Sequence, residues 1–221
     1  MAGKSATSRA AKKETPPRAW QRMLSGRRLD LLNPSPLDIE ITDIAHGLAR
    51  VARWNGQTVG PYIFSVAQHS LLVEKIAATL DPAIDRTGRL FMLLHDAPEY
   101  VVGDMISPFK ATIGEAYKSV ENRILDAILL RYALPATPQP SVARLAKRAD
   151  RMAAFFEAVA LAGFTRGEAE RIFGRPSIPA HLFERELAPA TIEASQARFL
   201  ERFHVIDQGV CRSQTGPEEA S

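Results

Sequence analysis

The sequence predicts an all-α fold, a single bundle of helices. Apolar residues recur at three- and four-residue intervals through most of the chain, the spacing that places them on one face of a helix. Alternating apolar and polar residues, typical of a half-buried strand, are nearly absent, and residues 37–41 are the one short stretch that fits. No internal repeat is present. Helix packed on helix is the architecture that such a pattern favours.

The chain is expected to be extended or turned before its first helix. Pro34 and Pro36 each push the preceding residue out of the α region of backbone space. Thr42 or Asp43 can then cap a helix whose apolar residues continue to Val51. The helical part of the chain should therefore begin near residue 42.

The later helices are placed by their capping residues and by the residues that stop them. Ser65 with Gln68 fits a capping box, and Thr87 can start the helix that follows. Ser141 can cap a long helix that stops at Gly163, and Pro189 fits the first turn of the last helix. The expected helices are 42–51, 65–76, 87–94, 112–133, 141–163 and 189–203.

Charge is distributed unevenly along the chain. Residues 1–28 hold eight basic residues and one acidic residue, whereas the whole chain has a net charge of +3, so the remainder is acidic. We interpret residues 1–28 as a basic, disordered tail, residues 29–205 as the folded domain and residues 206–221 as a polar C-terminal tail. Contact of the basic tail with nucleic acid or anionic lipid is the alternative to a solubilising role.

Composition excludes several classes of protein. Hydrophobic residues make up 46% of the 221 residues, enough for a folded core. No run of apolar residues is long enough to span a membrane, and no signal peptide is recognisable. Cys211 is the one cysteine, which excludes disulfide frameworks and cysteine-based zinc sites and fits a cytoplasmic location. Any metal ion must therefore be held by histidine and carboxylate side chains.

The strongest chemical signal is the doublet His95-Asp96. It follows the apolar run Leu90–Leu94, so both side chains are expected at the end of a buried helix. Burying two such polar groups is costly unless they have a partner. A divalent cation is a suitable one, because imidazole supplies a neutral nitrogen ligand and aspartate supplies charge. Paired buried polar groups without a metal ion are the alternative interpretation.

This doublet resembles the one that names the HD-domain phosphohydrolase superfamily. Its pattern is an upstream His, the His-Asp doublet and a downstream Asp, each from a different helix. His69 and Asp150 occupy the outer two positions here, and the resemblance covers roughly residues 40–160. It implies a helical HD domain and a metal site made of His69, His95, Asp96 and Asp150.

A narrower resemblance concerns the run from His95 to Lys110. This run is similar to that of bacterial HD-domain 5′-deoxynucleotidases and of related enzymes that cleave triphosphate from deoxyadenosine nucleotides. The resemblance implies that Glu99 orients the attacking water and that Asp104 protonates the leaving group. It also implies that Lys110 lies near the phosphate.

Other segments bear on the substrate. Arg53-Trp54 resembles a pair that contacts the sugar and phosphate of the nucleotide. The segment Asp43–His46 and the phrase around His69 are closer to the triphosphate-cleaving relatives, and Gln68 stands where the nucleotidases have Glu. The substrate therefore stays open between nucleoside monophosphates and triphosphates.

The resulting expectation is a metal-dependent phosphohydrolase that acts on (deoxy)nucleotides, with 5′-nucleotidase-type monoester hydrolysis as the leading activity. Release of triphosphate and a non-catalytic nucleotide-binding HD module are the alternatives. The ion can be Mn, Co, Zn, Mg or Fe, because a His/Asp set accepts several. A homodimer is implied by the resemblance, whereas a nucleic-acid or membrane partner is not expected. Lys147-Arg148 is interpreted as a solvated face, and neither His46 nor His181 is assigned a role.

Overall fold

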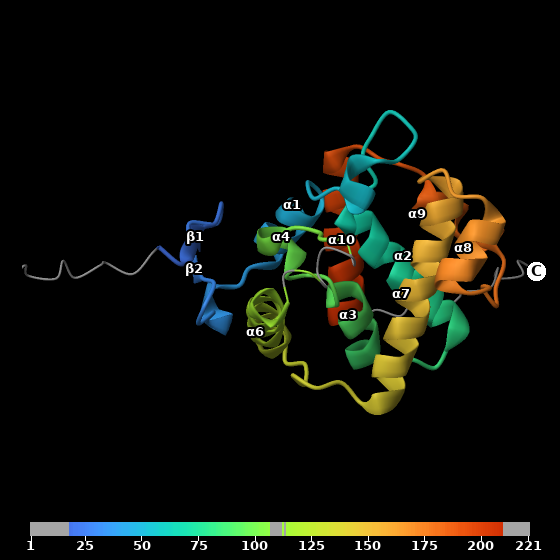
Figure 1. Cartoon of the computed structure of the whole chain (residues 1–221). Coiled ribbons are helices and arrows are strands. Elements are labelled where there is room, and N and C mark those ends of the chain that lie inside the picture. The colour runs from blue at the N-terminus through green and yellow to red at the C-terminus, as the bar shows by residue number, and fades with distance from the viewer. Residues whose placement is uncertain (1–17, 107–111, 113, 210–221) are drawn as a thin grey trace, which may run out of the picture.

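The computed structural model describes residues 18–106, 112 and 114–209. It confirms the all-α class, since helices carry the fold and the described strands form only a two-stranded sheet (Figure 1). The α-helices are α1 Ile41–Leu48, α2 Val66–Leu80, α3 Arg86–Leu94, α4 Glu99–Val102, α6 Glu115–Arg131, α7 Pro140–Ala160, α8 Arg166–Phe173, α9 Glu184–Leu187 and α10 Ile192–Asp207. Short 3₁₀ helices are η1 Pro36–Asp38, η2 Arg53–Gly56 and η3 Ala180–Phe183.

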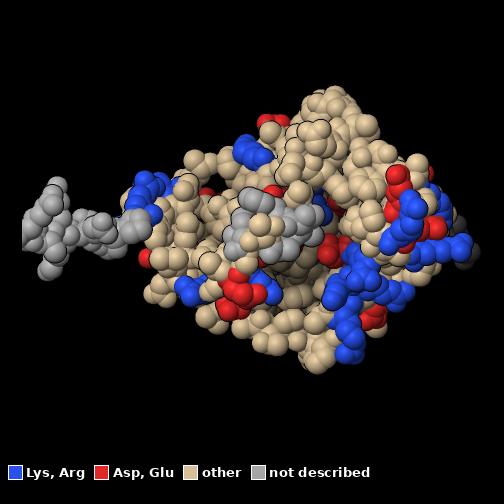
Figure 2. All heavy atoms as spheres, in the orientation of Figure 1, with Lys and Arg blue, Asp and Glu red and all other residues tan. Residues whose placement is uncertain are grey.

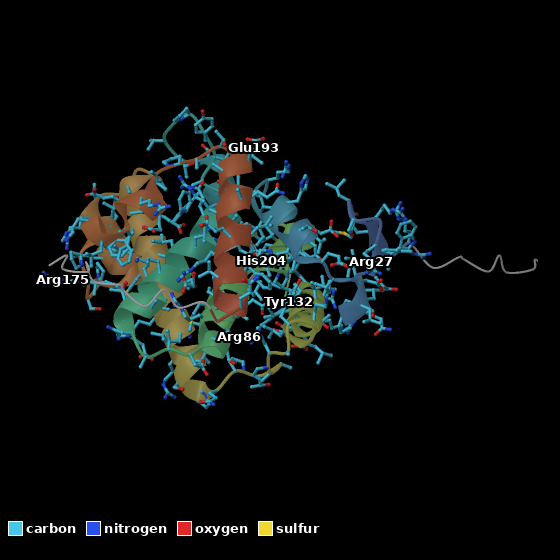
Figure 3. The ribbon with its side chains drawn as sticks, turned by 180° about the vertical axis from the view of Figure 1, so that it is seen from behind. Arg27, Arg86, Tyr132, Arg175, Glu193 and His204 are labelled. Atoms are coloured by element: carbon cyan, nitrogen blue, oxygen red, sulfur yellow. The ribbon has the colours of Figure 1, made fainter. Side chains whose placement is uncertain are left out.

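Helix α2 lies at the centre of the bundle and contacts α3, α7, α9 and α10. Its first turn, with Val66 and Ala67, belongs to one apolar cluster shared with α1, α3, α6 and α10. Its middle, with Leu72 and Ile76, belongs to a second cluster shared with α7 and α8. Figure 3 shows α10 crossing the back of the bundle, between the parts built by these two clusters. Because α2 is held from both sides, side chains at its buried start have fixed positions.

The helix starts show which capping predictions were right. The Ser65 side chain accepts a hydrogen bond from the Gln68 backbone N–H at 3.4 Å and caps α2 as expected, but the expected capping box is incomplete because the Gln68 side chain donates to the Ala188 carbonyl at 2.9 Å. Asp85, and not Thr87, caps α3, because its carboxylate accepts from Gly88 at 2.7 Å. Proline takes the first position of α7 in place of a serine cap. Thr191 caps α10, so Pro189 lies before this helix and not in its first turn.

The disordered N-terminal tail was expected to extend to residue 28, but the structure already forms strands from residue 20. Strands β1 Trp20–Arg22 and β2 Arg28–Asp30 form an antiparallel hairpin. The guanidinium groups of Arg18 and Arg28 lie 3.9 and 4.2 Å from the ring centre of Trp20. These cation–π contacts between two arginines and one tryptophan ring stabilise the hairpin. Part of the basic excess therefore belongs to folded structure.

Two further boundaries differ from expectation. Residues 37–41 form no strand, because Ser35 caps η1 and Ile41 already begins α1. At the other end the last helix continues to Asp207, past the expected boundary at 205. The side chain and backbone carbonyl of Asp207 accept hydrogen bonds from Arg86, which ties the end of α10 to the start of α3. Within the described ranges, no helix combines the length and the apolar character needed to cross a bilayer.

Asp43 joins the hairpin to the bundle and gives a prediction about stability. It is 5% exposed and accepts hydrogen bonds from the Ser25 hydroxyl and, at 3.0 Å, from the Ser25 backbone N–H. The substitution Asp43→Ala leaves both donors without this partner, so we expect unfolding free energy to fall by about 1–3 kcal/mol. Urea denaturation measures that loss, and amide hydrogen exchange should rise in residues 20–30. Unchanged exchange in the hairpin would show that Asp43 does not hold it.

Candidate metal centre

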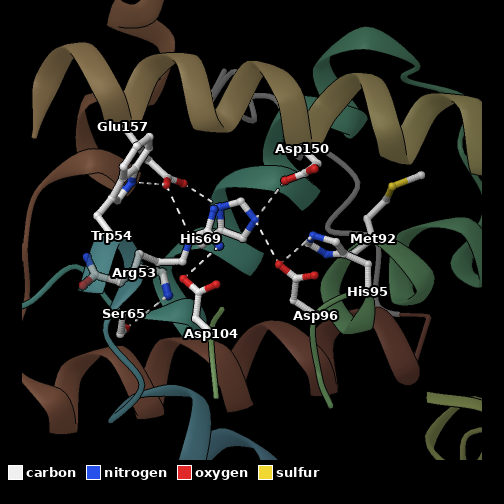
Figure 4. A network of polar contacts seen from close by, with 11 residues as sticks. Arg53, Trp54, Ser65, His69, Met92, His95, Asp96, Asp104, Asp150 and Glu157 are labelled. Carbon is white, nitrogen blue, oxygen red and sulfur yellow. Dashed lines mark hydrogen bonds and ion pairs between the residues drawn. The ribbon is translucent and has the colours of Figure 1, made fainter. Parts of the chain in front are cut away.

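Three helices bring the predicted metal ligands together (Figure 4). His69 is in the first turns of α2, His95 and Asp96 follow the last residue of α3, and Asp150 is in the middle of α7. His69 Nε2 lies 3.4 Å from Asp96 Oδ2 and 3.3 Å from Asp150 Oδ1. His95 Nε2 lies 3.3 Å from Asp96 Oδ2. The four side chains therefore converge on one point.

The second nitrogen of each imidazole ring fixes how that ring is turned. The Nδ1 of His95 lies 2.8 Å from the backbone carbonyl of Met92, which can only accept, so this nitrogen carries the proton. The Nδ1 of His69 lies 2.5 Å from Glu157 Oε1, again an acceptor. Both Nε2 atoms therefore face the aspartate carboxylates, and each offers a lone pair to a cation when its ring is neutral. Such orientation by a carboxylate or carbonyl is typical of metal-ligating histidines.

The arrangement fits a metal ion on a further observation. Within the part of the chain that the structure describes, the Nε2 atoms of His69 and His95 are buried and have no hydrogen-bond partner. Ligand atoms of His69, His95 and Asp150 all lie within 4.8 Å of one another, and these three could hold a metal ion. Asp96 Oδ2 lies 3.4 Å from His69 Nε2 and 3.3 Å from His95 Nε2 and adds a fourth ligand atom, the second oxygen of the set. Two imidazole nitrogens and two carboxylates suit a divalent cation.

Opposite charges dominate the electrostatics of this cluster. Burial alone would lower the pKa of His69 and His95, but neighbouring carboxylates outweigh it and raise the pKa of both rings. Burial alone would raise the pKa of Asp96 and Asp150, but contacts with the two rings lower the pKa of both carboxyl groups. The cluster thus attracts positive charge, whether it is carried by protons or by a cation.

Glu157 is a residue of the candidate site that the sequence analysis missed. It is fully buried on α7, seven residues after Asp150, on the same face of the helix. Besides His69 it accepts a hydrogen bond from Trp54 Nε1 at 2.9 Å, and Arg53 Nε lies 3.5 Å away. The signal was available, because Glu157 is the one charged residue in the apolar run 152–165.

The expected catalytic and substrate residues surround a cavity of about 550 Å³ that opens onto Asp96 and Asp150. Glu99, 1% exposed, is in the first turn of α4 and lines this cavity. Asp104 also lines it and accepts a hydrogen bond from Arg53 Nη1 at 3.2 Å. The charges of Glu157, Asp104, Asp96 and Glu99 outweigh burial and raise the pKa of Arg53, which therefore stays a cation. The predicted site residues are thus gathered in one place, except Lys110, which lies outside the described residues.

Trp54 reaches the cavity through an unusual backbone conformation. Its φ is 56° and that of Asn55 is 51°, so both residues adopt the left-handed region that is uncommon outside glycine. The indole is held by Glu157 and by ring contacts with Phe164 and Phe173 at 5.6 and 6.1 Å between centres. Strained backbone of this kind persists where surrounding contacts fix it, often at functional sites. His46 and His181, in contrast, line neither the cavity nor the ligand cluster.

Comparison with known proteins adds one relative. The chain is 54% identical over 191 residues to an uncharacterised protein of Rhodobacter capsulatus, a match that covers 86% of this chain and 96% of the relative. A scan against protein-family models gives no match.

Proposed function

We propose that this chain, which belongs to the same family as the Rhodobacter capsulatus protein, is a metal-dependent phosphohydrolase that acts on nucleotides. One observation carries the proposal: two buried Nε2 atoms without hydrogen-bond partners among the described residues face Asp96 and Asp150 beside an open cavity. The resemblance to HD-domain phosphohydrolases supports the same assignment. Phosphomonoester hydrolysis is the leading reaction.

His69, His95, Asp96 and Asp150 would hold the cation. When bound, a divalent ion supplies positive charge that polarises a phosphoryl oxygen and makes water a better nucleophile at neutral pH. Because Asp96 and Asp150 line the cavity whereas the histidines lie behind them, a phosphoryl group entering the cavity meets the cluster from its carboxylate side. The histidines are therefore shielded from solvent and hold the geometry of the site.

The remaining cavity residues have complementary roles. The buried carboxylate of Glu99 lines the cavity and would accept a proton from the attacking water. Arg53 can move its hydrogen bonds from Asp104 to the phosphoryl oxygens, where its charge offsets the charge that develops in the transition state. Asp104, released from that ion pair, would take up a proton from solvent in the open cavity and donate it to the leaving oxygen. The face of Trp54 offers an apolar wall for the nucleoside.

The test is hydrolysis by metal-depleted protein to which Mn²⁺, Co²⁺, Zn²⁺, Mg²⁺ or Fe²⁺ is added, with deoxynucleoside mono- and triphosphates as substrates. We expect metal-dependent turnover that falls by about 10²–10⁴-fold in Glu99→Gln, as for loss of a general base. Metal affinity should be retained in that variant, because Glu99 is not one of the ligands.

Glu115→Gln provides the matched control, since the Glu115 side chain is 92% exposed on α6 and does not line the cavity. Its turnover should equal that of the wild type. The products identify the reaction. Nucleoside together with free phosphate indicates a phosphomonoesterase, whereas intact triphosphate indicates a triphosphohydrolase. Nucleotide binding without turnover under any metal would replace this proposal by a non-catalytic nucleotide-binding module.

A further inference from the structure

A second cavity, of about 460 Å³, lies beside the cavity that is lined by Asp96 and Asp150. Five cationic side chains and no carboxylate line it; they are Arg144, Lys147, Arg148, Arg151 and Arg175, here called the basic row. Figure 2 shows Lys and Arg atoms gathered over α7 on this face. Arg175 lies at the opposite end of the molecule from Arg27 in the hairpin (Figure 3), so the basic row is separate from the basic N-terminal segment.

The basic row is not neutralised by the protein. Among the described residues, no ion pair includes any of its five members, whereas exposed arginines such as Arg27, Arg86 and Arg166 each pair with a carboxylate. The four members on α7 are spaced three and four residues apart and therefore share one face of that helix. Like charges at three- and four-residue spacing on a helix repel one another, which costs stability. A ligand that supplies negative charge would remove that cost.

The row is also built from more than one segment of the chain, because Arg175 follows α8 whereas the other four members are on α7. Helix α8 ends at Gly174, whose φ of 81° suits glycine and turns the chain, so that Arg175 lines the same cavity as the residues of α7. Arg148 Nη2 donates a hydrogen bond to the Ser177 hydroxyl at 2.8 Å, which fixes this arginine against the segment after α8. Two segments thus hold cations around one hollow.

The basic row extends along α7 from Asp150 towards the start of the helix. Lys147, Arg151 and Phe173 line both cavities, so the two hollows adjoin. Arg151 follows Asp150 directly, whereas Arg144 is six residues earlier, about 9 Å along the helix axis. An anion that reaches the cluster at Asp150 can therefore extend along α7 over several cations.

We propose that the basic row binds a chain of phosphate groups that continues beyond the phosphoryl group at the metal centre. This inference rests on the proposed function and narrows its substrate to a ligand with two or more linked phosphates, which favours the triphosphate-cleaving alternative over hydrolysis of nucleoside monophosphates. A single phosphoryl group at the metal ligands and Arg53 does not extend to Arg144 and Arg148. A linear phosphate chain does, and flexible basic side chains suit its closely spaced charges.

The test is calorimetric titration of the full chain with inorganic phosphate, pyrophosphate and tripolyphosphate, before and after addition of Mn²⁺. We expect affinity to rise with each added phosphate. The double variant Arg144→Gln/Arg148→Gln should bind tripolyphosphate about 10-fold more weakly than the wild type. Its affinity for orthophosphate should not change. The control Arg166→Gln/Arg171→Gln removes two exposed arginines from α8 outside the cavity and should bind all three ions like the wild type.

Equal tripolyphosphate affinity in the wild type and both double variants would overturn the inference, as would equal affinity of the wild type for one and three phosphates. Tighter binding of single-stranded DNA than of tripolyphosphate, lost in Arg144→Gln/Arg148→Gln, would overturn it in favour of a polynucleotide track. Metal-dependent turnover of nucleotides separates the two proposals. Nucleotide turnover without binding of tripolyphosphate to the basic row would overturn only this inference. Binding of tripolyphosphate to the basic row without nucleotide turnover would overturn the proposed hydrolase activity.

Discussion

Replacing Asp150 by asparagine is expected to abolish tight divalent-cation binding while the fold stays intact. The Asp150 carboxylate lies 3.3 Å from His69 Nε2, yet its side chain is 46% exposed, so an amide is accommodated without burying a new polar group. The amide lacks the charge that balances the cation. We expect the loss of affinity to exceed the roughly 10–100-fold that follows loss of an outer-shell partner. Calorimetric titration with Mn²⁺ or Zn²⁺ measures it.

The matched control is Asp126→Asn, an exposed aspartate on α6 that lies outside the cavity. This variant should bind the cation like the wild type, and both variants should have unchanged circular dichroism and melting temperature. Retention of wild-type affinity in Asp150→Asn would remove Asp150 from the ligand set.

Glu157→Gln should have the second large effect, because Glu157 supports three residues of the site. It accepts from the His69 and Trp54 rings, and Arg53 lies 3.5 Å away. The amide keeps the shape but loses the charge. We expect cation affinity to fall about 10–100-fold, since His69 loses its orienting carboxylate. Breaking a buried ion pair lowers the free energy of unfolding by about 3–5 kcal/mol. We expect a loss at the lower end of this range, because Arg53 retains its ion pair with Asp104.

The stability effect of Glu157→Gln should depend on pH in a defined direction. Burial alone would raise the pKa of Glu157, but the charges of His69 and Arg53 lower it to about 2 from the ordinary 4.5. A carboxyl group with a lowered pKa stabilises the folded state above its unfolded pKa and loses that contribution as it becomes protonated. The difference between wild type and variant should therefore be full above pH 4.5 and shrink towards pH 2.

Urea denaturation at several pH values, without added metal, measures this difference. Glu115→Gln is again the control, because the exposed Glu115 makes a single ion pair among the described residues, with Lys118 at 4.0 Å. It should lose little stability at any pH. A Glu157→Gln variant as stable as the control, with wild-type cation affinity, would show that Glu157 only fills space in the core.

Part of the predicted ligand set followed from the residues themselves, because His95-Asp96 is a polar doublet in apolar surroundings, whereas His69 and Asp150 were predicted from the resemblance to HD-domain phosphohydrolases. His95-Asp96 ends a buried helix, and each of the four ligands is in or next to a helix with a clear apolar face. The same reasoning would have found Glu157, two turns after Asp150. It was missed because a lone glutamate has no motif, and its role depends on His69, which is 88 residues away in the chain.

The hairpin and several helix starts could not be predicted, since contacts between distant segments decide them. Trp20–Arg22 and Arg28–Asp30 are too short to show a strand pattern and depend on the contacts of Trp20 and on Asp43. The pairing of Arg53 with Asp104 likewise joins residues 51 positions apart. The Arg-Trp pair was expected from resemblance, but its support by Glu157 was visible only in three dimensions.

Anomalous diffraction from a crystal of the Mn²⁺-soaked protein tests the central claim most directly. The account predicts one strong peak enclosed by His69 Nε2, His95 Nε2, an oxygen of Asp96 and an oxygen of Asp150, the four groups that converge in Figure 4. That peak should disappear in crystals of Asp150→Asn soaked in the same way. Absence of density between these side chains at saturating Mn²⁺, or a peak held by other residues, would contradict it.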